Sequence, residues 1–232
     1  MASLVHDGTA KSYLEIMKYL HENGGKNDIS CPMDDGSTPM HYVAYNGDIE
    51  TAKWLKSLGV DLSAASKDSR TPMLCAAMTG SVEMLDYLYY QADAQADIRK
   101  FYFDGTFTLL HAAASNGKLD AVKWLVERLP TDYPFLKDSA GDGSNAFLNA
   151  CKNNHMDVIK WWYDRFHHDS RFNLNLKNYN EDGALVFAVT AGNVELLNFL
   201  YDHGLTEVNK PGTFIGRVVQ ETGFVIFRFF LT

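Results

Sequence analysis

Three features are scarce in this sequence, and each scarcity argues against a class of protein. Only three cysteines occur among 232 residues; this odd, widely spaced set argues against a disulfide framework and favours a reducing, intracellular compartment, most simply the cytoplasm. Lysine and arginine number 21 against 29 acidic residues, and the formal net charge of −8 disfavours binding to nucleic acid or to an anionic membrane surface. No run approaches the roughly 18 apolar residues of a membrane helix, and the N-terminus does not have the regions of a signal peptide.

Repetition is what the sequence has instead, and its clearest unit is the stretch 35–47. An Asp-Gly pair at its start favours a tight turn, Thr38 can cap a helix with its hydroxyl, and Pro39 suits the first helical position. His41 is placed to reach back to the cap, and Gly47 suits a left-handed helix stop. The stretch therefore predicts a turn and a helix of about two turns, which is too short to be stable without neighbours.

Copies of this unit follow at regular intervals, with the cap positions 33, 37, 37 and 38 residues apart. Asn145 replaces threonine as the cap in the fourth unit, where Asn154 replaces glycine as the stop; both substitutions suit those conformations. The fifth unit has lost its threonine cap. The copies occupy residues 71–80, 108–117, 145–154 and 183–192.

A second apolar pattern begins at the same offset after each stop. Its apolar residues recur at helical spacing, and each copy carries an acidic residue in the first turn, where the helix dipole favours negative charge. Each copy predicts an amphipathic helix that begins at once after the first. These segments are 48–55, 81–88, 118–125, 155–162 and 193–200.

A turn, a Thr-Pro-x-His helix, a glycine and an amphipathic helix at 33-residue spacing resemble the ankyrin repeat. The resemblance implies an all-α solenoid of stacked helix-turn-helix units with finger loops, covering residues 34–204 as five repeats. Residues 13–24 fit the second helix of a degenerate repeat or cap within residues 1–33, and residues 205–232 are expected to form a partial repeat or an apolar tail. The connections after the second, third and fourth repeats are four or five residues longer than the family norm, so the finger geometry there stays open.

The resemblance also implies a function: a non-enzymatic adaptor or scaffold that binds another protein through the concave ankyrin surface. Tyr45, Met78, Phe107 and Tyr179 stand out among the implied contact positions, because aromatic and methionine side chains often anchor interfaces. The alternative is that some of them pack on adjacent fingers. The full set of implied partner-binding residues is Asp35, Ser37, Tyr45, Asn46, Lys67, Asp68, Arg70, Met78, Thr79, Phe107, Ser115, Asn116, Asp142, Ser144, Lys152, Asn153, Tyr179, Asn180 and Asp182.

Residues that suggest chemistry have simpler structural explanations. His41 and His111 occupy the Thr-x-x-His position, which predicts a helix-start hydrogen bond. Cys75 and Cys151 fall at positions that pack between repeats, and the run 167–169 (His-His-Asp) does not have the spacing of a metal site. The tryptophans recur at the core offset of the second helices, which predicts packing. We therefore expect no catalytic residue, cofactor or metal.

The C-terminal segment 224–232 is unusual because seven of its nine residues are apolar, whereas a terminal repeat should present a polar outer face. Either a partner covers this edge or the chain is a piece of a longer protein. Two alternatives therefore stand beside the adaptor. One is a structural subunit docked in a larger assembly through this apolar edge, and the other is the ankyrin portion of a larger intracellular enzyme or effector.

Overall fold

The computed structural model describes residues 9–23, 31–91, 98, 107–129 and 140–204. These residues form eleven α-helices and no strand; one isolated antiparallel bridge pairs Lys177 with Gly183. The chain divides into two compact units, residues 1–134 and 135–232, and each is treated by itself. The predicted segments 1–8 and 205–232 lie outside the described residues.

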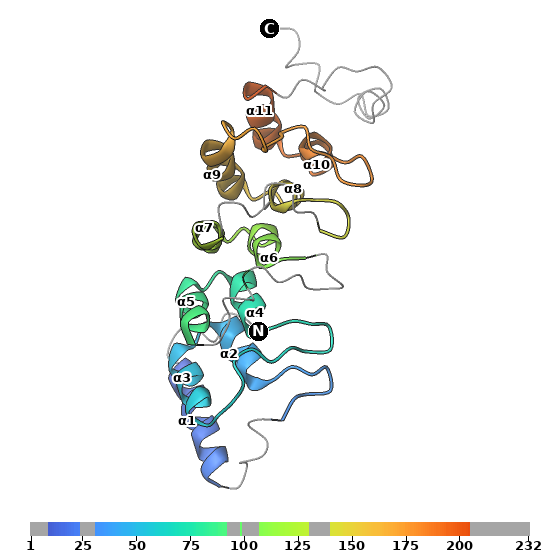
Figure 1. The fold of residues 1–232 in the computed structure, drawn as a ribbon. Coiled ribbons are helices and arrows are strands. Elements are labelled where there is room, and N and C mark those ends of the chain that lie inside the picture. The colour runs from blue at the N-terminus through green and yellow to red at the C-terminus, as the bar shows by residue number, and fades with distance from the viewer. Residues whose placement is uncertain (1–8, 24–30, 92–97, 99–106, 130–139, 205–232) are drawn as a thin grey trace. The chain divides into compact units, whose positions relative to one another are not determined.

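All ten helices expected for the five repeats are present, in pairs (Figure 1). The first unit holds α1 (Thr9–Glu22), α2 (Pro39–Asn46), α3 (Ile49–Ser57), α4 (Pro72–Thr79), α5 (Val82–Gln91), α6 (Leu109–Ser115) and α7 (Leu119–Arg128). The second unit holds α8 (Ala146–Lys152), α9 (Met156–Phe166), α10 (Ala184–Thr190) and α11 (Val194–Asp202). α1 overlaps the segment predicted as the second helix of a degenerate repeat, and it packs against α3.

The first helix of each repeat begins where its cap residue predicts. Thr71 and Thr108 accept hydrogen bonds at their hydroxyls from the third helical amide, at 3.3 Å each. Asn145 does the same through its amide oxygen at 2.9 Å, which confirms it as a cap. Gly183 has no side chain with which to cap α10, in agreement with the loss of threonine there.

The predicted helix stops are also confirmed. Gly47 ends α2 with φ of +72°, a left-handed conformation that side chains with a Cβ adopt only at a cost. Asn154, predicted to replace glycine, has φ of +61°. Asparagine tolerates this region better than most residues, so the substitution preserves the turn into α9.

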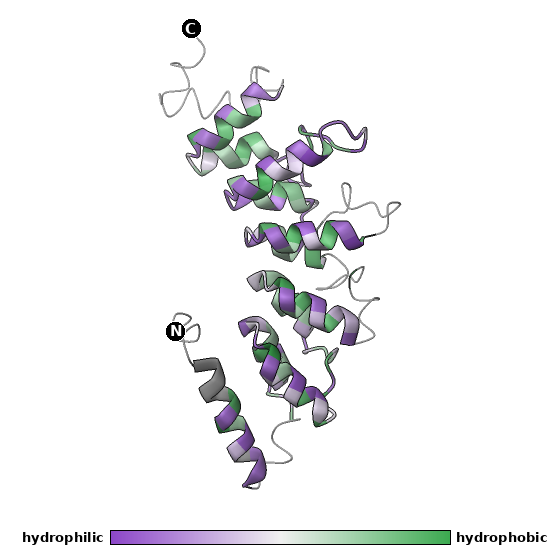
Figure 2. Ribbon diagram, turned by 90° about the vertical axis from the view of Figure 1, so that its left-hand side faces the viewer, coloured by the Kyte–Doolittle hydropathy of each residue, from purple (hydrophilic) through white to green (hydrophobic). Residues whose placement is uncertain are grey.

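Each unit buries an apolar core between its stacked helices. In the first unit α4 packs against both α2 and α6, and α5 against both α3 and α7. Each helix carries both hydrophobic and hydrophilic residues along its length, as expected of amphipathic helices that bury one face (Figure 2). The largest fully buried side chains are Met40, Leu55, Met73, Leu74, Met84, Leu85, Leu88, Leu109 and Leu125 in the first unit and Phe147 and Trp162 in the second.

The tryptophans pack in the second helices as predicted. Trp124 and Trp162 are buried, and Trp124 donates a hydrogen bond through Nε1 to a carboxylate oxygen of Asp86 at 2.6 Å. Trp54 and Trp161 are half-buried. Their rings therefore contribute to packing and leave part of their surface exposed.

Four described finger loops share one turn. In each, the first amide donates to the carbonyl of the fifth residue at 2.7–2.9 Å, and the fourth residue has φ between +64° and +84°. The turn persists before α8 and α10, where the long connections had left the geometry open. Neighbouring fingers are joined where Lys67 N–H donates to Asp35 O and where Tyr179 N–H donates to Asp142 O, at 2.9 Å each. The four turns are residues 33–37, 66–70, 140–144 and 178–182.

Candidate functional site

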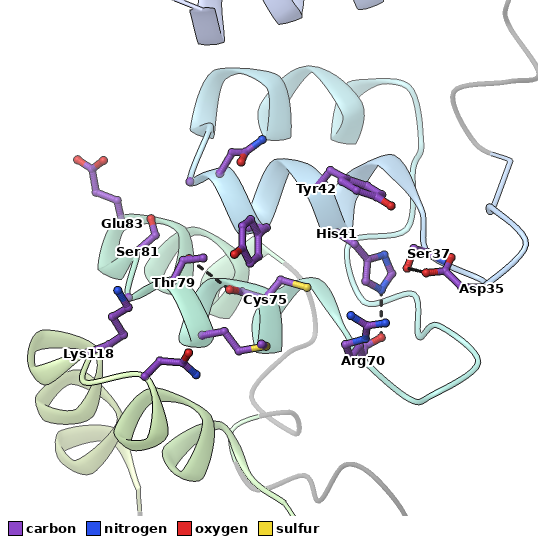
Figure 3. Close-up of a pocket in the computed structure, with 16 residues that line it drawn as sticks. Asp35, Ser37, His41, Tyr42, Arg70, Cys75, Thr79, Ser81, Glu83 and Lys118 are labelled. Atoms are coloured by element: carbon purple, nitrogen blue, oxygen red, sulfur yellow. Dashed lines mark hydrogen bonds between the residues drawn. The ribbon is translucent and has the colours of Figure 1, made fainter. Parts of the chain in front are cut away.

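A groove of about 1100 Å³ lies over the first helices of the first unit (Figure 3). Its floor comes from α2 and α4, whose sequences contain no aspartate, glutamate, lysine or arginine. Charged side chains line it at the finger turns and at the starts of α5 and α7. Eight of the sequence-predicted contact residues line it: Asp35, Ser37, Tyr45, Asn46, Arg70, Met78, Thr79 and Asn116.

The floor of the groove presents two tyrosines from α2. Tyr42 is 44% exposed and Tyr45 is 51% exposed, while Met78 from α4 is half-buried and Cys75 is buried. The Tyr42 hydroxyl donates to Met33 Sδ at 3.3 Å. An uncharged floor with half-exposed aromatic and methionine side chains can bury apolar groups of a ligand.

Hydrogen bonds fix the finger end of the groove. Ser37 donates its backbone N–H and its hydroxyl to the carboxylate of Asp35, at 2.9 Å each, and these bonds hold the pKa of Asp35 below its ordinary value. Arg70 pairs through Nε with Asp68 Oδ2 at 2.8 Å. Two charged side chains of opposite sign, Asp35 and Arg70, are therefore held in fixed turns at this end.

His41 is structural, as the sequence predicted. Thr38 N–H donates to its Nδ1 at 3.0 Å, so Nε2 carries the ring proton and donates to the carbonyl of Arg70 at 3.0 Å. His41 is only 4% exposed. His41 thus closes the cap of α2 and ties the first repeat to the turn of the second.

Sequence reasoning missed several lining residues, among them Tyr42, Glu83 and Lys118. Lys118 lies over Gly80, where an added Cβ would sit 2.9 Å from Lys118 Cδ. Glu83 and Lys118 follow the helix stops, outside the positions that the resemblance implied. Tyr42 could have been noticed in the sequence, because it is an aromatic residue at the position that Cys75 occupies in the next repeat.

Two predicted contact residues are buried. Ser144 has no exposed surface in this structure, and its N–H donates to Asp142 Oδ1 at 2.9 Å and closes the turn; its role in partner binding stays a prediction. Ser37 lines the groove with only 6% of its surface exposed, for the same reason.

The remaining predicted residues are exposed or half-buried outside this groove, and their roles stay predictions. Phe107 packs its ring against His111, with centroids 5.5 Å apart. The exposed members are Lys67, Asp68, Lys152, Asn153, Tyr179 and Asn180, and the half-buried ones are Phe107, Ser115, Asp142 and Asp182.

The other candidates for chemistry have structural roles. Burial raises the pKa of the Cys75 thiol to about 11 and raises that of Cys151 further, as expected of core residues. Asp169 is bound by Arg171 at 2.7 Å. Within the part of the chain that is described, no group of three or more His, Cys, Asp or Glu side chains is arranged to hold a metal ion. None of the described helices has the length and apolarity needed to span a membrane.

The paired helices, repeated finger turns and groove define an ankyrin-repeat protein. A family model described as ankyrin repeats (three copies) matches residues 6–100 and 110–211. The match covers well over half of the chain, and the chain therefore belongs to the ankyrin-repeat family. Repeats of this family generally mediate protein–protein interaction and are generally not catalytic.

Curated relatives share the repeats within much longer proteins. The ankyrin repeat and KH domain-containing protein mask-1 of Caenorhabditis elegans is 28% identical over 196 residues, which is 84% of this chain and 7% of that protein. The tyrosine-protein kinase Shark of Drosophila melanogaster is 26% identical over 61% of this chain and 14% of its own length. The ankyrin repeat domain-containing protein oryK of Aspergillus oryzae is 23% identical over 88% of this chain and 31% of its own length. The chain thus spans less than a third of each of these relatives.

Proposed function

We propose that this chain is a non-enzymatic adaptor or scaffold that binds a segment of a partner protein in the groove over α2 and α4. The observation that carries the proposal is Tyr45, which is 51% exposed and lines a groove whose floor has no charged residue. Tyrosine is among the residues that most often dominate binding energy at interfaces. Met78 on the neighbouring helix supplies an adaptable apolar contact beside it.

The groups that line the groove favour binding over catalysis. His41 uses both ring nitrogens in backbone hydrogen bonds, so it is not available as a general base. Cys75 is a poor nucleophile, because burial raises the pKa of its thiol. The three free cysteines, with Cys31 exposed, support a place in a reducing compartment such as the cytoplasm.

The proposal is tested by placing a photo-crosslinking amino acid at position 45 and, as a matched control, at position 90. Tyr90 is 66% exposed and lies on α5, outside the groove lining. Irradiation in lysate of the source cell should give a discrete crosslinked protein from position 45 and not from position 90. Identical products from both positions would contradict the groove assignment.

A competition experiment makes the test specific. Unlabelled chain should suppress the crosslink, whereas the double variant Tyr45→Ala, Met78→Ala should need roughly tenfold or more higher concentration to do so. Both side chains are at least partly exposed, so the variant should stay folded, with a stability change of about 0.5 kcal/mol per site. Equal suppression by the variant would remove Tyr45 and Met78 from the binding site.

A further inference from the structure

The second unit carries an exposed aromatic side chain that packs against the preceding finger turn. Tyr179 is 76% exposed, more than any other large apolar side chain described. Its N–H donates to Asp142 O at 2.9 Å, and its ring lies against Gly143, where an added Cβ would be 2.7–2.9 Å from three ring carbons. The finger before α8 therefore supports the ring while most of it remains open to a ligand.

Among the described residues, the charged groups of turns 140–144 and 178–182 and their ion-pair partners carry an excess of negative charge. Asp142 pairs with Lys152 at 3.2 Å, and the exposed Glu181 pairs with Lys177 at 3.6 Å. Asp182 lies on the same turn as Tyr179 and has no lysine or arginine within ion-pair distance among the described residues. Among the described residues of turns 140–144 and 178–182 and their ion-pair partners there are thus three carboxylates and two ammonium groups, and Asp182 can accept a cation from a ligand.

The fold does not require this combination of side chains. Turns 66–70 and 178–182 have the same hydrogen bonds, and Ser69 and Glu181 both have φ of +64°. Lys67 and Arg70 stand at the positions of Tyr179 and Asp182. Because the same backbone accepts basic side chains at these two positions, the turn alone does not account for an exposed tyrosine and a carboxylate that has no ion-pair partner among the described residues. Packing on Gly143 does not account for it either, since three quarters of the tyrosine stays exposed.

We propose that residues 178–182, named here the tyrosine finger, bind a lysine or arginine side chain of a partner protein against the ring of Tyr179, with Asp182 supplying the counter-charge. A cation over an aromatic face is attracted by the electron-rich ring, and guanidinium groups also stack on it. The partner is accordingly a protein with a basic exposed segment. This contact is separate from the groove of the first unit and does not depend on it.

The experiment pans a phage-displayed library of random linear peptides against the full chain. Selected peptides are then measured by fluorescence anisotropy, each beside a copy in which citrulline, a neutral analogue, replaces arginine. The protein variants are Tyr179→Ala and the double variant Tyr179→Lys, Asp182→Arg, which gives this turn the side chains of turn 66–70. Tyr201→Ala is the control, because Tyr201 is 57% exposed in the same unit.

We expect selected peptides to be enriched in lysine and arginine. Their affinity should fall about threefold to tenfold with Tyr179→Ala or with citrulline, and should fall further with the double variant, while Tyr201→Ala has no effect. Thermal unfolding of the double variant should match the parent, because the backbone turn accepts both sets of side chains.

The outcomes separate this inference from the proposed function. Peptides without a basic bias, or basic peptides that bind Tyr179→Ala unchanged, overturn the tyrosine finger. If such peptides lose affinity for Tyr45→Ala instead, the groove assignment is supported. Failure to select any peptide counts against both.

Discussion

Replacing His41 by alanine tests the most specific link that the structure shows between two repeats. The ring accepts a hydrogen bond from Thr38 N–H and donates one to Arg70 O, at 3.0 Å each, and the residue is 4% exposed. Alanine removes both bonds and leaves Thr38 N–H without its partner, whereas Arg70 O keeps the bond that it accepts from Ser66 N–H. The cap of α2 and the turn before α4 should therefore loosen together.

The expected loss follows from the burial of each backbone group. Thr38 is buried, so its unsatisfied N–H should cost about 1–3 kcal/mol, whereas the Arg70 carbonyl loses one of its two hydrogen bonds and keeps the one from Ser66 N–H, a loss of about 1 kcal/mol. The sum is a decrease of about 2–4 kcal/mol in the free energy of unfolding. His41→Gln should recover part of this, because glutamine at the third helical position can still bond the cap amide.

Urea unfolding followed by circular dichroism measures the loss, with His168→Ala as a surface histidine control. Hydrogen exchange locates it: peptides covering 33–37 and 66–70 should exchange faster in His41→Ala, because Lys67 N–H bonds to Asp35 O across the two turns. A free energy of unfolding within about 0.5 kcal/mol of the parent, with both turns still protected, would refute the reasoning.

Two further predictions concern the second unit. Gly143→Ala should lower stability by about 1–2 kcal/mol, because Gly143 has φ of +84°, and it should also displace the ring of Tyr179. Gly192→Ala is the control: Gly192 has φ of +65° and nothing lies within 4 Å of an added Cβ, so this variant should show the backbone effect alone. An unshifted Tyr179 ring signal in NMR spectra of Gly143→Ala would contradict the predicted displacement. Arg171 lowers the pKa of Asp169 to about 2 through side-chain and backbone hydrogen bonds, so Arg171→Gln should raise the carboxyl midpoint in an NMR titration. Because the pKa of Asp169 is depressed in the folded state, the stabilising effect of this pair is full above about pH 4 and is lost as pH falls towards about 2. An unchanged midpoint of Asp169 in Arg171→Gln would refute this role of Arg171.

The helices could be predicted from sequence because each local signal has one physical meaning. A threonine followed by proline, a histidine at the third helical position and a glycine after two turns specify a start and a stop, and the structure has them at Thr38 and Gly47. Asn154 was recognisable for the same reason, since few residues other than glycine and asparagine tolerate φ of +61°. The finger turns after long connections were not predictable, because insertion length does not reveal where the extra residues lie.

The groove was harder to predict, because it depends on which side chains of neighbouring repeats are left uncovered. The position of Ser144 in the turn looks exposed in the sequence, whereas the structure buries this residue and bonds its N–H to Asp142 Oδ1. Tyr42 was missed because its position is normally a packing position; here it is 44% exposed. Lys118 reaches the groove only because its aliphatic stem crosses Gly80 of the preceding repeat. This contact joins two repeats, so the sequence of either repeat alone does not predict it.

The repeats themselves show where specificity is encoded. Residues that determine the backbone conformation recur from repeat to repeat, as Gly47 and Gly80 do with φ of +72° and +83°. The residues just before them change from Tyr45 and Asn46 to Met78 and Thr79, while the backbone stays the same. Since these positions do not determine the fold, the residues there can differ between repeats according to the ligand that is bound. A substitution there should therefore change what is bound before it changes stability, and the reverse should hold for the capping residues and the glycines.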